Sequence, residues 1–252
     1  MEERIDREKS FHDGRFGADS DSRETLSRLQ DDLLKLAKRA TYDAIQARCS
    51  GKTVLDYGCG LGSVSCRCVR DYGARSVVGI DVSDVAVDCA RRLATERRID
   101  NITFEAMNAE AMTLADDTFD LACGFGILHH LDLSRSISEL ARVLKPDGTA
   151  VFLEPLGHNP ALNLFRRMTP GLRTADEHPL LLKDLDVVRA HFGRLDVRFF
   201  NLTTLAVAPW PRYLGRRYLL HSLAACDRVL FARAPFLRKF AWEILLTFSE
   251  PR

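Results

Sequence analysis

The sequence lacks the features that mark several specialised classes of protein. Its 36 basic and 35 acidic residues leave a formal charge of +1, so the chain as a whole has no strong field for a polyanion. It has no apolar run of the roughly 18 residues that a membrane-spanning helix needs. Its first 24 residues are charged throughout and have no apolar core of a secretory signal. We therefore expect a cytoplasmic protein with no nucleic-acid partner.

The seven cysteines do not indicate a disulfide framework or a zinc site. Cys66 and Cys68 are too close in sequence to bridge easily, and no cysteines show the paired CxxC spacing of a zinc site. Free or buried thiols in a reducing compartment are the simplest interpretation. We expect no bound metal.

What the sequence does contain is a regular alternation of two patterns. Short apolar runs typical of buried parallel strands lie at residues 53–58, 76–81, 102–107, 119–124 and 149–154. Helical patterns precede and separate them, at residues 24–49, 63–71, 84–98 and 135–144. A Lys-Pro-Asp-Gly sequence at 145–148 predicts a turn into the fifth run. The alternation predicts βαβ units and a doubly wound, Rossmann-like α/β fold.

Beyond residue 155 the pattern is less regular. A helix is predicted over 183–192, ending at Gly193, and strands over 196–202 and 242–248. Between the strands, residues 203–241 are rich in leucine and aromatics and carry seven basic residues against one acidic. A packing cap, a cover for an apolar substrate and a helix lying on an anionic membrane are alternatives for this segment.

The domain prediction follows from these patterns. Residues 1–23 are expected to form a mobile lead or lid, and residues 24–252 a single domain. Residues 203–241 are expected to be a helical insertion before the last strand.

The strongest local signal is a glycine-rich loop after the first predicted strand. Gly58, Gly60 and Gly62 allow a tight turn and a close approach of ligand to backbone. A dinucleotide site would need its third glycine at position 63, which is serine. Asp56 also has the wrong charge beside a pyrophosphate and suits an ammonium group. An NAD-dependent oxidoreductase is therefore a disfavoured alternative.

Polar residues follow the next two strands. Asp81 ends the second strand, where a carboxylate can accept hydrogen bonds from both ribose hydroxyls of an adenosine. Asn108 follows the third strand, where a side-chain amide could bind an adenine edge.

Four stretches in order resemble the class I S-adenosylmethionine-dependent methyltransferases, in particular the small-molecule group that includes the ubiquinone and menaquinone methyltransferases. They are VLDYGCGLG, VVGIDVS, NAEAMTLADDTFDLACGFGILHHL and LARVLKPDGTAVFLEP, and they cover roughly residues 50–155. The resemblance implies a mostly parallel seven-stranded sheet with an antiparallel edge strand, and S-adenosyl-L-methionine as cofactor.

The resemblance also implies roles for individual residues. Asp56 and the loop Gly58–Gly62 would contact the methionine moiety, and Gly124 would flank it. Asp81 would hold the ribose and Val82 would pack on the adenine. Asn108 and Ala109 occupy the place of an Asp-Ala pair that reads the adenine in the family, and the asparagine is a departure from that pattern.

Methyl transfer to oxygen or nitrogen also requires a group that takes the acceptor's proton. The candidate bases are His129, His130 and His158, because histidine titrates near neutral pH. Glu154 and His178 fall near the same cleft, and His12 resembles part of a lid signature. The histidine pair could instead pack or orient its loop.

The acceptor is not named by any motif. We expect a small, apolar or quinone-like molecule, methylated at oxygen or, failing that, at carbon. Residues 203–241 could cover this acceptor and touch the membrane from which it comes. A methyltransferase acting on RNA or protein, and a catalytically silent binding fold, are the remaining alternatives.

Overall fold

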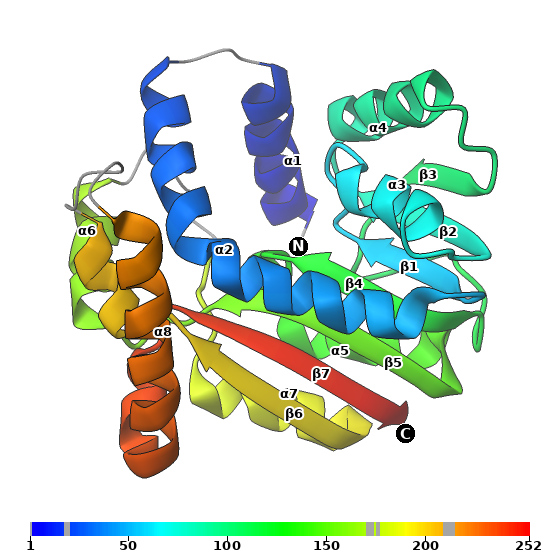
Figure 1. Ribbon diagram of the computed structural model, residues 1–252. Coiled ribbons are helices and arrows are strands. Elements are labelled where there is room, and N and C mark those ends of the chain that lie inside the picture. The colour runs from blue at the N-terminus through cyan, green and yellow to red at the C-terminus, as the bar shows by residue number, and fades with distance from the viewer. Residues whose placement is uncertain (1, 18–20, 170–173, 175–176, 209–214) are drawn as a thin grey trace.

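The computed structural model describes residues 2–17, 21–169, 174, 177–208 and 215–252, and its core is one seven-stranded sheet (Figure 1). The strands are β1 (Thr53–Tyr57), β2 (Ser76–Asp81), β3 (Ile102–Ala106), β4 (Phe119–Phe125), β5 (Leu144–Pro155), β6 (Phe192–Phe200) and β7 (Glu243–Pro251). Their spatial order is β3-β2-β1-β4-β5-β7-β6.

The direction of the strands confirms the predicted doubly wound sheet. β1 to β5 pair in parallel, and β7 pairs antiparallel with both β5 and β6. The antiparallel pairings are thus confined to one side of the sheet, where β7 lies between β5 and β6. From β1, the next strands in sequence are added on one side of the sheet (β2, β3) and then, starting with β4, on the other side. Ligands bind at such a switch point, here between β1 and β4, in open α/β sheets.

Helices cover both faces of the sheet (Figure 1). On one face α2 (Asp21–Cys49) and α3 (Ser63–Arg70) bury Ala37, Ile45 and Cys68 against β1, β4 and β5. On the other face α5 (Leu133–Val143) and α7 (Leu185–His191) bury Ile137 and Val188. α4 (Asp84–Glu96) packs on β2 and β3 through small side chains around Phe104, after Ser83 caps its first turn.

The N-terminal segment has a structure that the sequence patterns did not indicate. Residues Glu2–Gly17 form helix α1, and α2 begins at Asp21. In Figure 1, α1 lies between the N-terminal part of α2 and α4, above the sheet. That residues 1–23 act as a lid stays a prediction.

Two local predictions change in detail. The segment 145–148 lies within β5, where it forms a bulge, because Phe119 pairs with Leu144 but Leu121 pairs with Thr149. The helix predicted over 183–192 ends at His191, so Gly193 follows its C-cap residue Phe192, as predicted. The strand predicted from residue 196 already begins at Phe192 and includes this glycine. Pairing with β7 extends the strand over this glycine, since Phe192 pairs with Pro251.

The insertion before β7 is helical, as predicted. It contains the 3₁₀ turns η4 (Thr203–Val207) and η5 (Pro235–Phe240) and the helix α8 (Arg216–Arg233). The buried Asp227 fixes α8 to η4 by accepting hydrogen bonds from the backbone N–H groups of Leu202 (3.0 Å) and Thr203 (2.7 Å). Residues 209–214 lie outside the described chain. Among the helices described, none has the length and apolarity needed to cross a bilayer.

Candidate functional site

A cavity of about 270 Å³ opens at the carboxyl ends of β1, β2 and β4, at the switch point of the sheet. Its wall combines the loops after four strands with one side of α1. The lining residues are Arg4, Ile5, Glu8, Gly58, Gly60, Ile80, Asp81, Val82, Met107, Asn108, Ala109, Glu110, Phe125, Gly126, Ile127, His130 and Leu131. Six of the nine residues predicted to bind cofactor are among them.

The glycine loop forms the floor of this cavity. Gly58 and Gly60 have φ values of 77° and 49°, a left-handed backbone that favours glycine. A Cβ on Gly58 would lie 2.7 Å from the Ile127 side chain, so the two loops approach as closely as atoms allow. The loop therefore brings backbone, rather than side chains, to a ligand.

Asp81 is held in a fixed orientation at the end of β2. Its two carboxylate oxygens accept hydrogen bonds from the backbone N–H groups of Gly60 (2.9 Å) and Ser83 (3.0 Å). A carboxylate oxygen can accept more than one hydrogen bond, so each can still receive a ligand hydroxyl. Val82 lies next to it in the same wall.

The loop after β3 forms the next part of the wall. The Asn108 side chain accepts a hydrogen bond from the N–H of Glu110 (2.9 Å), and the Ala109 carbonyl accepts one from the Tyr57 hydroxyl (2.6 Å). The Asn108 oxygen is thus used within the loop, which leaves its amide N–H₂ group as the donor available to a ligand.

Three predicted cofactor residues lie outside the cavity lining. Asp56 is buried and accepts a hydrogen bond from the Ser65 hydroxyl. Burial raises the pKa of Asp56 to about 6, while the hydrogen bonds from Ser65 act in the opposite direction. Gly62 and Gly124 leave room for neighbours, because a Cβ would come within 2.8 Å of Ala90 and 2.6 Å of Phe152. Their contact with cofactor stays a prediction.

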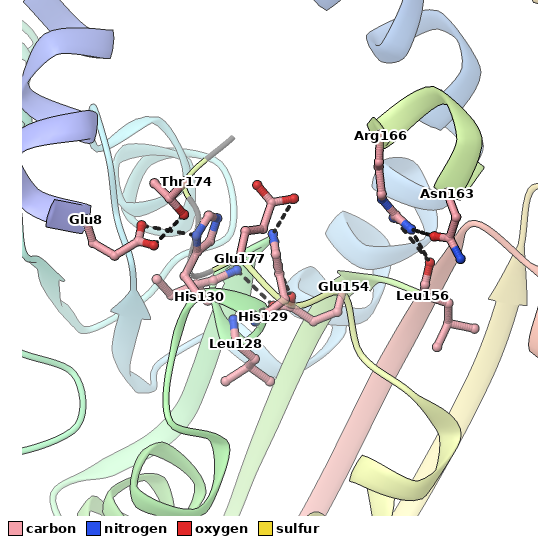
Figure 2. Close-up of polar contacts among 11 residues, drawn as sticks. Glu8, Leu128, His129, His130, Glu154, Leu156, Asn163, Arg166, Thr174 and Glu177 are labelled. Carbon is pink, nitrogen blue, oxygen red and sulfur yellow. Dashed lines mark hydrogen bonds and ion pairs between the residues drawn. The ribbon is translucent and has the colours of Figure 1, made fainter. Parts of the chain in front are cut away.

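The histidine pair lies at the other end of the site, in the turn Leu128–His130 after β4 (Figure 2). Nδ1 of the buried His129 lies 2.8 Å from Oε2 of Glu154, at the end of β5. The same carboxylate accepts hydrogen bonds from the backbone N–H groups of Ile127 (3.0 Å) and Leu128 (2.9 Å). A carboxylate only accepts, so Nδ1 of His129 carries a proton, and in the neutral imidazole Nε2 has the lone pair.

His130 faces both the cavity and helix α1. Its Nδ1 lies 3.2 Å from Oε2 of Glu8, and the other oxygen of that carboxylate, Oε1, accepts a hydrogen bond from the Thr174 hydroxyl (Figure 2). Arg4, one turn earlier in α1, donates to the His130 carbonyl (2.6 Å) and pairs with the buried Glu110. Charged groups of α1 thus fix the helix over the cavity.

The remaining histidines are placed differently. Nε2 of His158 accepts a hydrogen bond from the Leu182 N–H (3.1 Å), and the residue lies outside the cavity lining. His158 therefore orders the segment before α7 in this structure, and its role as a base stays a prediction. His178 is exposed and its backbone N–H donates to the His129 carbonyl (2.8 Å). The His12 side chain lies outside the described part of the molecule.

Sequence reasoning missed three residues that surround the histidine pair. Arg4 and Glu8 belong to a polar helix with no apolar stripe, and Glu177 follows an irregular segment. No local pattern signals them, because each meets the site through a contact far away in sequence.

Comparison with known proteins matches the part of the chain that contains β1 to β4 and the loops after them. Residues 54–148 match the family described as a methyltransferase domain. This part of the chain is similar to a methyltransferase domain. The resemblance seen in the four motifs is thereby confirmed, and S-adenosylmethionine is the cofactor of this class of domain.

Curated relatives of the methyltransferase domain include enzymes of quinone synthesis. The ubiquinone/menaquinone biosynthesis C-methyltransferase of Geobacter sulfurreducens is 38% identical over 121 residues, which cover 47% of this chain and 46% of that one. The ubiquinone biosynthesis O-methyltransferase of Coxiella burnetii is 33% identical over 115 residues, 45% of this chain and 48% of that one. The chain thus spans about half the length of these relatives.

Solved structures confirm the fold. The YcgJ protein of Bacillus subtilis aligns with a TM-score of 0.58 at 21% identity, over 85% of this chain and 99% of that one. A geranyl diphosphate C-methyltransferase of Streptomyces coelicolor aligns with a TM-score of 0.59 at 17% identity, over 84% and 79%. At these identities the likeness concerns the fold of the methyltransferase domain.

Proposed function

We propose that this chain transfers a methyl group from S-adenosylmethionine to a small acceptor. The observation that carries the proposal is that one cavity is lined both by the fixed carboxylate of Asp81 and by His130, whose neighbour His129 is oriented by Glu154. When bound, the cofactor supplies an electrophilic methyl group. The protein then has to hold the acceptor in line and remove its proton.

The cofactor side of the proposal rests on a close fit of backbone. Gly58 and Gly60 leave a floor without side chains, and Asp81 would accept the ribose hydroxyls. Val82 and Ala109 would pack on the adenine, and the Asn108 amide would donate to its edge. Asp56 would act indirectly: it accepts a hydrogen bond from Ser65, in the helix that follows the glycine loop, and so would hold the loop in place.

On the acceptor side, the histidines would take the proton from an oxygen acceptor. His129 is the better oriented of the two, because Glu154 fixes its tautomer and leaves Nε2 to accept a proton. His130 lines the cavity itself. This arrangement supports oxygen as the methylated atom, ahead of a carbon of a quinone-like ring.

An apolar, quinone-like acceptor is the proposed substrate class. Support comes from the two quinone-synthesis relatives and from the helical insertion. Exposed apolar and basic side chains occur together on this insertion, which would let it touch an anionic membrane. Those side chains include Arg217, Tyr218, Arg228, Val229, Arg233 and Phe236.

Helix α1 would act as the lid. Its residues line the cavity and reach across to the loops after β3 and β4 through Arg4 and Glu8. Cofactor entry would then require these contacts to open.

Calorimetry with S-adenosylhomocysteine tests the first step, with NADH as the control ligand. We expect S-adenosylhomocysteine to bind at micromolar strength and NADH not to bind. Transfer of a labelled methyl group would follow, to hydroxylated quinones in anionic vesicles, with RNA and a protein extract as alternative acceptors. Binding of NADH alone, or labelling of a macromolecule only, would contradict the proposal.

A further inference from the structure

We propose that His129, His130 and Glu177 bind a divalent transition-metal ion at the acceptor end of the cavity. One ligand atom from each residue lies within 4.8 Å of the other two. Figure 2 shows His130 between Glu8 on one side and the His129–Glu177 pair on the other. This site differs from the expectation, drawn from the cysteine spacing, that no metal is bound.

The spacing of the three groups is the first argument. Metal bonds to imidazole and carboxylate are about 2.0–2.2 Å long, so tetrahedral ligand atoms lie about 3.3 Å apart. Nε2 of His129 and Oε1 of Glu177 are 4.0 Å apart, too far for a hydrogen bond but within the span of two such metal bonds. His130 and Glu177 are partly exposed, and movements of about 1 Å by their side chains would bring the three ligand atoms to the spacing of a bound ion.

The second argument is the carboxylate behind each imidazole. Nδ1 of His129 faces Glu154 at 2.8 Å, and Nδ1 of His130 faces Glu8 at 3.2 Å. Histidines that bind metals almost always donate their other ring N–H to such a partner, which fixes the tautomer that presents a lone pair to the ion. His129 has this arrangement, and the Glu8 carboxylate lies beside Nδ1 of His130 as an ion-pair contact; both carboxylates are buried. Nε2 of His129 lies on the side of the ring that faces Glu177.

The chemistry of the donor set indicates which ion would bind. Two imidazoles and one carboxylate suit zinc or ferrous iron and do not suit Mg²⁺ or Ca²⁺, which prefer oxygen ligands. Three protein ligands also leave a coordination position open.

The role of the ion rests on the proposed function. The open position would receive an oxygen of the acceptor and lower the pKa of its hydroxyl, whose proton would pass to solvent. The acceptor oxygen would then form a bond to the methyl carbon as the bond from that carbon to the cofactor sulfur breaks, which leaves S-adenosylhomocysteine. His129 would then be a ligand rather than a base. The acceptor would be one with a hydroxyl or paired oxygens, such as a catechol-like ring.

The test is metal binding alone, without cofactor or acceptor, so that it does not depend on the proposed function. Metal-free protein, with its tag removed and with Cys226→Ser to eliminate the exposed thiol, is titrated with Co²⁺ and with Zn²⁺. Visible absorption reports the Co²⁺ site, and equilibrium dialysis gives the stoichiometry of Zn²⁺. Glu177→Gln removes one ligand, Glu154→Gln removes a partner behind a ligand, and Glu96→Gln is the control on an exposed part of α4.

We expect one ion per chain. Zn²⁺ should displace bound Co²⁺ from the site, and Mg²⁺ should not. Glu154→Gln should weaken binding by about 10–100-fold, Glu177→Gln by at least as much, and Glu96→Gln not at all. Absence of stoichiometric binding, or equal affinity in Glu177→Gln and Glu96→Gln, would overturn the metal site. Normal S-adenosylhomocysteine binding in the same protein would show that the proposed function survives that result.

Discussion

Nδ1 of His129 lies 2.8 Å from Oε2 of Glu154, and the two side chains are buried at the ends of neighbouring strands. The carboxylate is fixed by backbone N–H groups of the turn that carries the histidine. The pair is therefore a rigid unit, and a change at Glu154 acts on the turn beside the cavity through the imidazole and through these backbone N–H groups.

Glu154→Gln should lower kcat by at least about 10-fold while leaving the affinity for S-adenosylhomocysteine within about 2-fold. The Gln N–H₂ group facing Nδ1 would favour the tautomer with the proton on Nε2, which could then neither accept a proton nor bind a metal. Steady-state kinetics and calorimetry separate the two effects, with Glu96→Gln as control. A parallel loss of affinity and kcat would point to a structural role instead.

Asp81→Ala should weaken S-adenosylhomocysteine binding by about 1.5–3 kcal/mol, because charge-assisted hydrogen bonds to the ribose are lost. Calorimetry measures the change, and Asp88→Ala, on the exposed side of α4, provides the matched control. Unchanged affinity in Asp81→Ala would remove this residue from the cofactor site.

Gly58→Ala and Gly51→Ala form a matched pair. Both glycines have positive φ, 77° and 71°, so alanine at either costs about 1–2 kcal/mol of backbone strain. Only at Gly58 does the new Cβ meet a side chain, 2.7 Å from Ile127, whereas Gly51 has no neighbour within 4 Å. Urea unfolding should show the larger loss for Gly58→Ala, with cofactor binding lost only there. Equal losses would mean that Ile127 moves aside freely.

Glu243→Gln should make the protein more stable at alkaline pH. Burial raises the pKa of Glu243 from its ordinary 4.5 to about 8, and the charge of Glu154 acts in the same direction. Between these two values the folded state binds more protons than the unfolded state, so its stability falls as pH rises. Relative to Glu243→Gln, the wild type should lose on the order of 3–5 kcal/mol between pH 5 and pH 9. Parallel urea-unfolding profiles for the two proteins over this range would contradict the prediction.

Arg4→Ala should speed the release of S-adenosylhomocysteine by about 10-fold or more, because α1 would lose its charge-assisted contacts with Glu110 and the His130 carbonyl. Stopped-flow fluorescence gives the rate. Lys9→Ala is the control: Lys9 lies on α1, as Arg4 does, and forms an exposed ion pair with Asp84 of α4. Exposed ion pairs contribute little to stability. Similar release rates in both variants would exclude a specific role of Arg4 in closing the lid.

Much of the fold could be predicted because the information is local. Short apolar runs such as 53–58 mark parallel strands that are buried on both faces, and Gly58 marks the turn that follows. The loops that carry Asp81 and Asn108 could be placed at one edge, since parallel strands end together. These residues do line one cavity.

The acceptor side could not be predicted in the same way. Helix α1 is stabilised by contacts such as Arg4 with Glu110 and Glu8 with His130, which no local pattern announces. His158 lies near the site in sequence, yet its ring nitrogen is used by the Leu182 N–H. Tertiary partners, rather than periodicity, decide the role of each of these side chains.

The place of the helical insertion in the chain has a consequence for how such a protein can change. The matched residues 54–148 contain the glycine loop and the histidine pair, whereas the helical insertion follows them in the chain and contributes no residue to the cavity lining. Substitutions in the insertion can therefore accumulate without altering the loops that line the cavity. A lineage could vary this outer surface while it inherits the cavity unchanged.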